Sequence, residues 1–151
     1  MLKWCVLAAA LGLLSSASPA RCADKPELTG TWQLVEVKWA TADGASSIFV
    51  SSKSFLVIDA DTIIRREEGD DGKVKDRKYS YTVDAKKKPA VYEQKSLDGD
   101  NKGAVSTGIC EVDGDTLKMC SKAKGLPEDF AIKQGKEIKD KYLYVYTRVK
   151  K

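Results

Sequence analysis

Short segments in which apolar and polar residues alternate, each ended by a turn signal, fill the chain from residue 32 to residue 149. An alternation of period two is typical of β-strands that have one face buried. The segments that meet this criterion are eight in number: 32–39, 54–58, 62–67, 78–83, 90–96, 104–112, 116–121 and 141–149. Eight antiparallel strands are enough to close a barrel. The sequence therefore predicts an all-β, eight-stranded, antiparallel up-and-down barrel, with an open sandwich as the alternative.

The first predicted strand carries two alternations that are out of phase. Trp32 and Leu34 belong to one, and Val35, Val37 and Trp39 belong to the other. Successive side chains of a strand point to opposite faces, so an unbroken strand could bury only one of the two sets. A β-bulge between Leu34 and Val35 would place both sets on the inner face.

The two ends of the predicted barrel carry the residues that would mark its closure. Gly30-Thr31-Trp32 opens the first strand, and Arg148 lies in the last strand. An up-and-down barrel closes by pairing its first strand with its last. We therefore expect both ends to meet at one rim, with Trp32 and Arg148 in contact.

The first residues have the composition of a secretory signal peptide. Lys3 supplies a positive charge, residues 6–14 are apolar but too few to span a bilayer, and residues 15–20 are mostly small. The rest of the chain has no apolar stretch long enough to cross a membrane. We expect an exported protein, either periplasmic or secreted.

Cleavage after Ala20 places the small residue Ser18 at the −3 position, whereas cleavage after residue 23 would place Arg21 there, which is disfavoured. We therefore expect residues 1–20 to be the signal peptide and residues 21–151 to form a single barrel domain. Arg21 also disfavours lipid anchoring through Cys22, because it immediately precedes that cysteine.

Charge and composition argue against several classes of function. The chain has 26 basic and 22 acidic residues, a formal net charge of +4, and the lysines are interleaved with acids. The one basic run, Lys86-Lys87-Lys88, has no aromatic residue beside it and is followed by Pro89, which indicates a solvated turn. The sequence therefore predicts no nucleic-acid partner.

No catalytic or metal site is predicted. The chain has no histidine, which excludes Ser-His-Asp and Cys-His catalysis and removes the commonest zinc ligand. Adjacent acids fall in glycine-containing turns, where carboxylates bond to their own backbone. The loop 98–103 resembles a calcium loop, but Lys102 occupies a ligand position and Ile109 stands where a glutamate is needed. We expect no cofactor.

Cys110 and Cys120 flank the Asp113-Gly114-Asp115 turn, which is the strongest hairpin signal of the chain. An exported protein permits disulfides, so a Cys110–Cys120 bond stays open as a prediction. If Val112 pairs with Leu117, the two thiols point to opposite faces. A bond would then need a bulge or a shifted register.

Tyrosines repeat on one face of two predicted strands. Tyr142, Tyr144 and Tyr146 alternate along the last strand, and Tyr79 and Tyr81 do so on an earlier one. One interpretation is packing of the barrel wall. The other is a cavity that offers rings and hydroxyl groups to a small apolar or aromatic ligand. These five tyrosines are the candidate ligand-binding residues.

A set of ordered segments resembles a family of uncharacterised exported planctomycete proteins, which is similar to lipocalins in its opening Gly-x-Trp motif. The segments are 28–35, 86–89, 108–117, Cys120, 127–130 and 148–150. The resemblance implies a lipocalin-like barrel. It also implies structural roles for Gly30, Trp32 and Arg148, with the tryptophan at the closed base and the arginine packed across it.

Three functions from different classes remain. The first is a non-enzymatic barrel that binds a small hydrophobic or amphipathic ligand. The second is an envelope interaction or inhibitor module with a packed interior that contacts a protein partner through its loops, and the third is a hydrolase that uses carboxylates or a Ser-Lys pair. A cavity of about 300 Å³ or more, lined by apolar and aromatic groups, would favour the first over the second.

Overall fold

A computed structural model describes residues 25–41, 44–50, 53–132 and 141–150. The predicted signal peptide and Cys22 lie outside these residues. The elements follow one another as α1 (Lys25–Leu28), β1 (Gly30–Thr41), β2 (Gly44–Phe49), β3 (Ser54–Ile58), β4 (Thr62–Glu68), β5 (Val74–Asp84), β6 (Ala90–Ser96), β7 (Val105–Asp113), β8 (Thr116–Lys122) and β9 (Lys141–Arg148).

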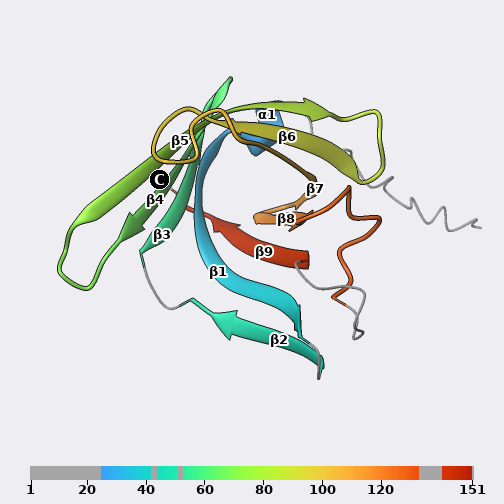
Figure 1. Cartoon of the computed structure of the whole chain (residues 1–151), viewed down its shortest axis with the longest axis horizontal. Helices are drawn as coiled ribbons and strands as arrows, with labels where there is room; N and C mark the ends of the chain where they lie inside the picture. Colours follow the sequence, from blue (N-terminus) through green and yellow to red (C-terminus); the bar gives the residue numbers. More distant parts are fainter. Residues whose placement is uncertain (1–24, 42–43, 51–52, 133–140, 151) are drawn as a thin grey trace, which may run out of the picture.

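The strands form one antiparallel sheet that closes on itself. From β3 to β9 each strand pairs with the next, β1 pairs with β3, and the pairing of β1 with β9 closes the ring (Figure 1). Closure satisfies the backbone groups that an open sheet would leave unpaired at its two edges. The predicted closed barrel is confirmed, and the open sandwich is wrong.

The described structure contains one strand more than the sequence predicted, because one barrel strand is interrupted. Residues 30–33 of β1 pair with β3, residues 36–41 pair with β2, and residues 32–39 pair with β9. A strand has only two edges, so β2 and β3 share the edge opposite β9 and act as two parts of one strand. The barrel is therefore eight-stranded, as predicted.

The bulge predicted in β1 is present. The register of β1 against β9 shifts between Leu34, which pairs with Tyr146, and Glu36, which pairs with Val145. Val35 is the extra residue, and its carbonyl accepts a hydrogen bond from the amide of Val50. As a result Leu34 faces inward before the bulge, and the Val37 and Trp39 positions fall on the same inner face after it.

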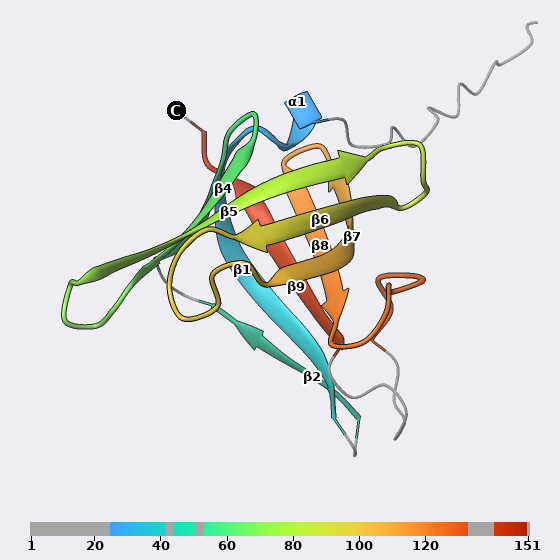
Figure 2. The same cartoon turned by 45° about the horizontal axis from the view of Figure 1, so that its top comes forward.

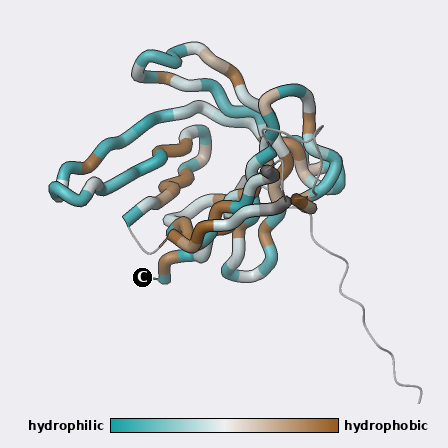
Figure 3. Tube along the Cα trace, turned by 60° about the horizontal axis from the view of Figure 1, so that its bottom comes forward, coloured by the Kyte–Doolittle hydropathy of each residue, from teal (hydrophilic) through white to brown (hydrophobic). Residues whose placement is uncertain are grey.

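The buried residues form two layers on opposite faces of the sheet. The larger layer fills the barrel and contains Leu28, Trp32, Leu56, Ile58, Ile63, Tyr81, Ala90, Tyr92, Cys110, Leu117, Met119 and Tyr146. The smaller layer lies outside the wall, where Ile109, Cys120 and Leu143 are covered partly by Phe130 and Ile132. The hairpin of β4 and β5 extends away from the barrel and is hydrophilic along most of its length (Figures 2 and 3).

The register separates the two cysteines. Cys110 pairs with Met119 and faces inward, whereas Cys120 pairs with Ile109 and belongs to the outer layer. Both thiols are free. The Cys110–Cys120 disulfide that the sequence left open therefore does not form, because Val112 pairs with Leu117 and no bulge in the hairpin brings the thiols to one face.

Candidate functional site

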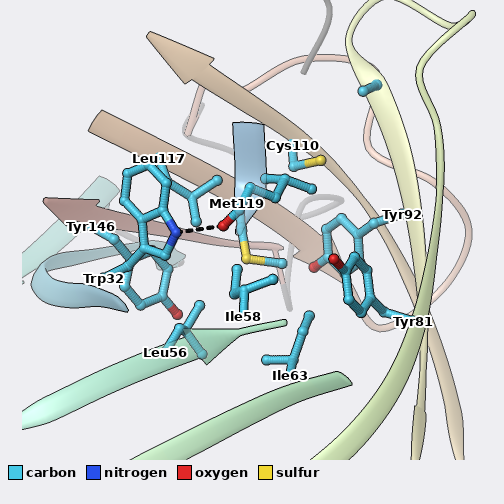
Figure 4. Close-up of a cluster of buried hydrophobic side chains, with 12 residues drawn as sticks. Trp32, Leu56, Ile58, Ile63, Tyr81, Tyr92, Cys110, Leu117, Met119 and Tyr146 are labelled. Atoms are coloured by element: carbon cyan, nitrogen blue, oxygen red, sulfur yellow. Dashed lines mark hydrogen bonds between the residues drawn. The ribbon is translucent and has the colours of Figure 1, made fainter. Parts of the chain in front are cut away.

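One end of the barrel is sealed by the residues of the Gly-x-Trp segment. Trp32 is completely buried, and its indole Nε1 donates a 2.7 Å hydrogen bond to the carbonyl of Leu28 (Figure 4). The Arg148 guanidinium lies 4.0 Å from the centroid of the Trp32 ring and donates to the carbonyls of Thr29 and Glu27. The indole N–H, two guanidinium nitrogens and the ring of Trp32 are therefore engaged in holding the fold at this end.

The candidate tyrosines all lie on the inner face, at different depths. Tyr142, Tyr144 and Tyr146 form a stripe along β9, with successive ring centroids 6.5 Å apart. Tyr142 is 38% exposed near the open end, Tyr144 is half-buried, and Tyr146 is 3% exposed near the sealed end. The stripe therefore runs from the open end of the barrel into its core.

Two of the candidate tyrosines are core residues. Tyr146 packs beside Trp32 (Figure 4). The Tyr81 hydroxyl donates a 2.8 Å hydrogen bond to the carbonyl of Asp59 in the turn between β3 and β4. Burial raises the pKa of Tyr146 to about 12. The Tyr81 hydroxyl is therefore engaged within the fold, whereas Tyr146 still borders a small cavity together with Tyr144. Tyr79 lines a second cavity, and Tyr142 lines neither of the two.

Arg65 is the polar residue at the centre of this region, and sequence reasoning missed it. Its guanidinium carbon lies 5.8 Å from the Tyr79 ring centroid and 5.6 Å from that of Tyr144. Burial lowers the pKa of Arg65, but the nearby tyrosines, Tyr146 foremost, raise it more, so the net direction is upward. The group is a permanent cation inside the barrel.

The Arg65 guanidinium is incompletely satisfied. Its Nε is buried without a hydrogen-bond partner, and within the described residues no carboxylate forms an ion pair with this side chain. Two ring faces stabilise the charge by about 0.5–1 kcal/mol each. They supply no acceptor for the buried N–H.

Arg65 lines one of two cavities in this region, and its neighbour Tyr79 lines the other. A cavity of about 50 Å³ lies between β1, β3, β4 and β9, where Arg65, Glu67 and Tyr144 contribute to its lining. A second cavity of about 620 Å³ opens between β5, β6, β7 and the loop 97–104. We call this second space the mouth cavity; its inner-face lining residues are Lys75, Arg77, Tyr79, Gln94, Ser96 and Ser106. Tyr79 connects the two, since its ring both lines the mouth cavity and contacts Arg65.

Side chains occupy much of the barrel interior. The cavity of about 620 Å³ lies at the open end and its lining is mostly polar, so neither of these two cavities is the apolar interior void that the first hypothesis anticipated. The physical reason is the size of the inward residues: Trp32, Tyr81, Tyr92, Met119 and Tyr146 occupy the space. A ligand would have to be held at the mouth.

Two features are absent from the described part of the chain. No group of three or more Cys, Asp or Glu residues in that part of the chain is arranged to hold a metal ion. None of the helices described there is long and apolar enough to cross a membrane.

The comparisons with known proteins agree with the fold. No family model matches the sequence, and no curated protein matches it, so the resemblance to the planctomycete family remains a prediction. A crystal structure of a lipocalin-like protein from Bacteroides uniformis ATCC 8492 is similar, with a TM-score of 0.53 and 13% sequence identity. The match covers 81% of this chain and 98% of that one. The chain has a lipocalin-like fold. At this identity the likeness shows the fold alone.

Proposed function

We propose that this protein is an exported, non-enzymatic lipocalin-like protein that binds a small amphipathic ligand at the open end of its barrel. The observation that carries the proposal is the partly unsatisfied Arg65 cation between Tyr79 and Tyr144, where Arg65 lines the small cavity and Tyr79 lines the mouth cavity. Binding sites commonly combine a concave space, aromatic rings and a few polar groups that fix orientation. The mouth cavity offers all three.

The filled interior defines what can bind. The space below Arg65 is about 50 Å³ and takes one small group, whereas the mouth cavity is about 620 Å³ and takes the body of a small molecule. A long apolar ligand buried along the barrel axis does not fit this packing. A ligand with one polar end at Arg65 and a ring or short chain against Tyr79 and Tyr144 does.

Titration with a fluorescent amphiphile, 8-anilinonaphthalene-1-sulfonate, tests this proposal. The wild-type protein should bind it with saturation, and Tyr144→Ala should weaken binding at least fivefold while the far-ultraviolet circular dichroism is unchanged. Thr147→Ala is the matched control, because Thr147 is on the outer face of the same strand. A wild type that binds no probe would overturn the proposal.

Export has its own test. Expression of residues 1–151 in a bacterial host, followed by N-terminal sequencing of the protein recovered outside the cytoplasm, should give a mature chain that begins at Arg21. A mature product that still begins at Met1 would overturn the proposed localisation, and a lipid-modified Cys22 would show membrane anchoring instead.

The second candidate is a protein-interaction module at the envelope. The filled interior favours it, and so does the apolar rim of β2, where Ile48 is 56% and Phe49 is 77% exposed. Within the described sheet β2 pairs with β1 on one edge only. Phe49→Ser should then weaken capture of an envelope protein and leave probe binding intact, whereas the first proposal predicts that no specific protein is captured.

A further inference from the structure

We infer that the polar end of the ligand is a carboxylate, held between Arg65, which lines the small cavity, and Arg77, which lines the mouth cavity. This inference rests on the proposed ligand-binding function and names the chemistry of its ligand. Four observations carry it: the incomplete satisfaction of Arg65, the position of Arg77, the charge balance of the inner face, and the sizes of the two cavities.

The unliganded protein is destabilised because Arg65 lacks a hydrogen-bond acceptor, and a ligand that supplies one removes this cost. A buried N–H without a partner loses its bond to water and gains nothing in return, which costs free energy. The Nε of Arg65 is in that position. A carboxylate matches a guanidinium with two parallel hydrogen bonds and neutralises its charge, so it is the complement of this group.

Arg77 places a second cation directly opposite the first. Arg65 of β4 and Arg77 of β5 are cross-strand partners, so their side chains leave the same inner face. Like charges directly opposite each other destabilise a sheet. Arg77 lines the mouth cavity, and no ion pair holds it elsewhere among the described residues. An anion between the two guanidinium groups turns a repulsion into a two-sided attraction.

The remaining charges on this face do not cancel the pair. Glu67 is the cross-strand partner of Lys75, and no ion pair joins its carboxylate to Arg65 among the described residues. Asp76 faces outward, where both of its carboxylate oxygens accept from Arg66 at 2.7 and 2.9 Å. Two further carboxylates, Asp98 and Asp100, line the mouth cavity from the loop 97–104, and the Asp98 carboxylate accepts from the backbone amide of Lys78. Among the described residues neither of them forms an ion pair with Arg65 or Arg77.

The lining also favours a carboxylate over a doubly charged phosphate. Glu67 borders the small cavity beside Arg65, and its carboxylate repels a dianion more strongly than a monoanion. The volume of about 50 Å³ suits a small planar head group, and the rest of the ligand must extend toward Tyr79 and the mouth cavity. The class is therefore a monocarboxylic amphiphile, either a fatty acid or a small aromatic acid.

Isothermal titration of the full mature protein with probes that differ only in the head group tests this inference. Decanoate should bind at least tenfold more tightly than 1-decanol, and decyltrimethylammonium should bind more weakly than both. 3-Phenylpropionate is the second carboxylate arm: tighter binding of decanoate indicates a lipid source, and tighter binding of phenylpropionate indicates an aromatic acid.

Two neighbouring arginines on opposite faces of β4 give a matched pair of variants. Arg65→Gln should weaken decanoate binding at least tenfold and decanol binding much less, and Arg77→Gln should weaken decanoate binding at least threefold. Arg66→Gln, whose side chain is exposed and bonded to Asp76, should change it less than twofold. Arg77→Gln keeps the test decisive if Arg65→Gln does not fold, since Arg77 is exposed.

The outcomes separate this inference from the proposal on which it rests. If decanol and decanoate bind equally well, or if Arg65→Gln and Arg77→Gln bind decanoate like wild type, the carboxylate inference is overturned and ligand binding at the mouth stands. If no probe of any charge binds, both are overturned. If the Arg65 and Arg77 variants lose the preference for decanoate over decanol and the Arg66 variant keeps it, the inference is supported.

Discussion

The guanidinium carbon of Arg148 lies 4.0 Å from the centroid of the Trp32 ring, although 116 positions separate the two residues. They are direct cross-strand partners in the pairing of β1 with β9. The contact exists only because the ring of strands closes. Gly30 has a φ of +137°, a backbone conformation that favours glycine. A Cβ at this position would lie 3.0 Å from Nη1 of Arg148.

Mutations of this pair should be coupled. Trp32→Ala should reduce the free energy of unfolding by about 3–5 kcal/mol, because it empties a fully buried site. Arg148→Ala should cost about 2 kcal/mol through the lost ring contact and the two lost backbone hydrogen bonds. Since each loss includes the shared contact, the double variant should be less destabilised than the sum of the two.

Urea denaturation of the four proteins, followed by circular dichroism, measures this coupling. Strict additivity would mean that the guanidinium contributes nothing through the indole, and that Arg148 acts through its carbonyl partners alone.

The sequence predicted the barrel because its signals were local. Alternation, turn residues and the phase change at Leu34 and Val35 each follow from period-two geometry, and the structure has the strands and the bulge where these signals place them. β2 was missed for the same reason. Its sequence, Gly44–Phe49, holds small and polar residues until Ile48, so no alternation marks it as half-buried.

The candidate site was less accessible to sequence reasoning. The tyrosines were placed on one face by their spacing, but the depth of each one depends on distant strands. Arg65 was missed because Arg65-Arg66 looks like one exposed charged pair, and only the register with β5 shows which of the two faces inward. The available signal was its phase with Ile63, a buried residue two positions earlier.

Close approach of two strands at Gly108 should make that position intolerant of a side chain. A Cβ there would lie 2.3 Å from the carbonyl oxygen of Cys120 and 2.6 Å from the ring of Tyr92. Gly108→Ala should therefore lower the free energy of unfolding by about 2–3 kcal/mol. Gly69→Ala, where the nearest atom belongs to the flexible Asp71 side chain, is the control and should cost less than about 0.5 kcal/mol. Equal thermal midpoints for the two variants would show that the strands can separate at little cost.

The two thiols of the β7–β8 hairpin should be present and unreactive in the native protein. Cys110 and Cys120 are buried and free, and burial raises the pKa of both, to about 12 for Cys110. Because the thiolate is the reactive form, alkylation with iodoacetamide at pH 8 should modify neither residue until denaturant is added. Peptide mapping by mass spectrometry measures this. A Cys110–Cys120 cross-linked peptide would contradict the register of the hairpin.

Removal of the Arg65 charge should stabilise the unliganded protein while it removes ligand binding. Arg65→Met keeps the volume of the side chain and abolishes the buried N–H that has no partner, so the free energy of unfolding should rise by about 1 kcal/mol. Such a gain is expected where a residue is retained for binding and not for folding. Arg66→Met, on the exposed face, should change stability little. A loss of stability in Arg65→Met would show that the contacts with Tyr79 and Tyr144 outweigh the missing acceptor.

Alkaline pH should unfold the protein through its buried phenols and thiol. Burial raises the pKa of Tyr146 and of Cys110 to about 12, whereas in the unfolded chain these groups ionise near 10 and 8.5. Below about pH 8 both groups are protonated in both states, and their contribution is fully present. As the pH rises toward 12 the unfolded state loses protons first, so stability falls by up to about 1.4 kcal/mol per pH unit for each group. Tyr146→Phe should make the decline of the urea midpoint between pH 10 and 12 shallower than in the wild type. Thr147→Ala is the control and should leave this decline unchanged. Identical slopes in all three proteins would mean that the Tyr146 hydroxyl is already exposed to solvent through the open end.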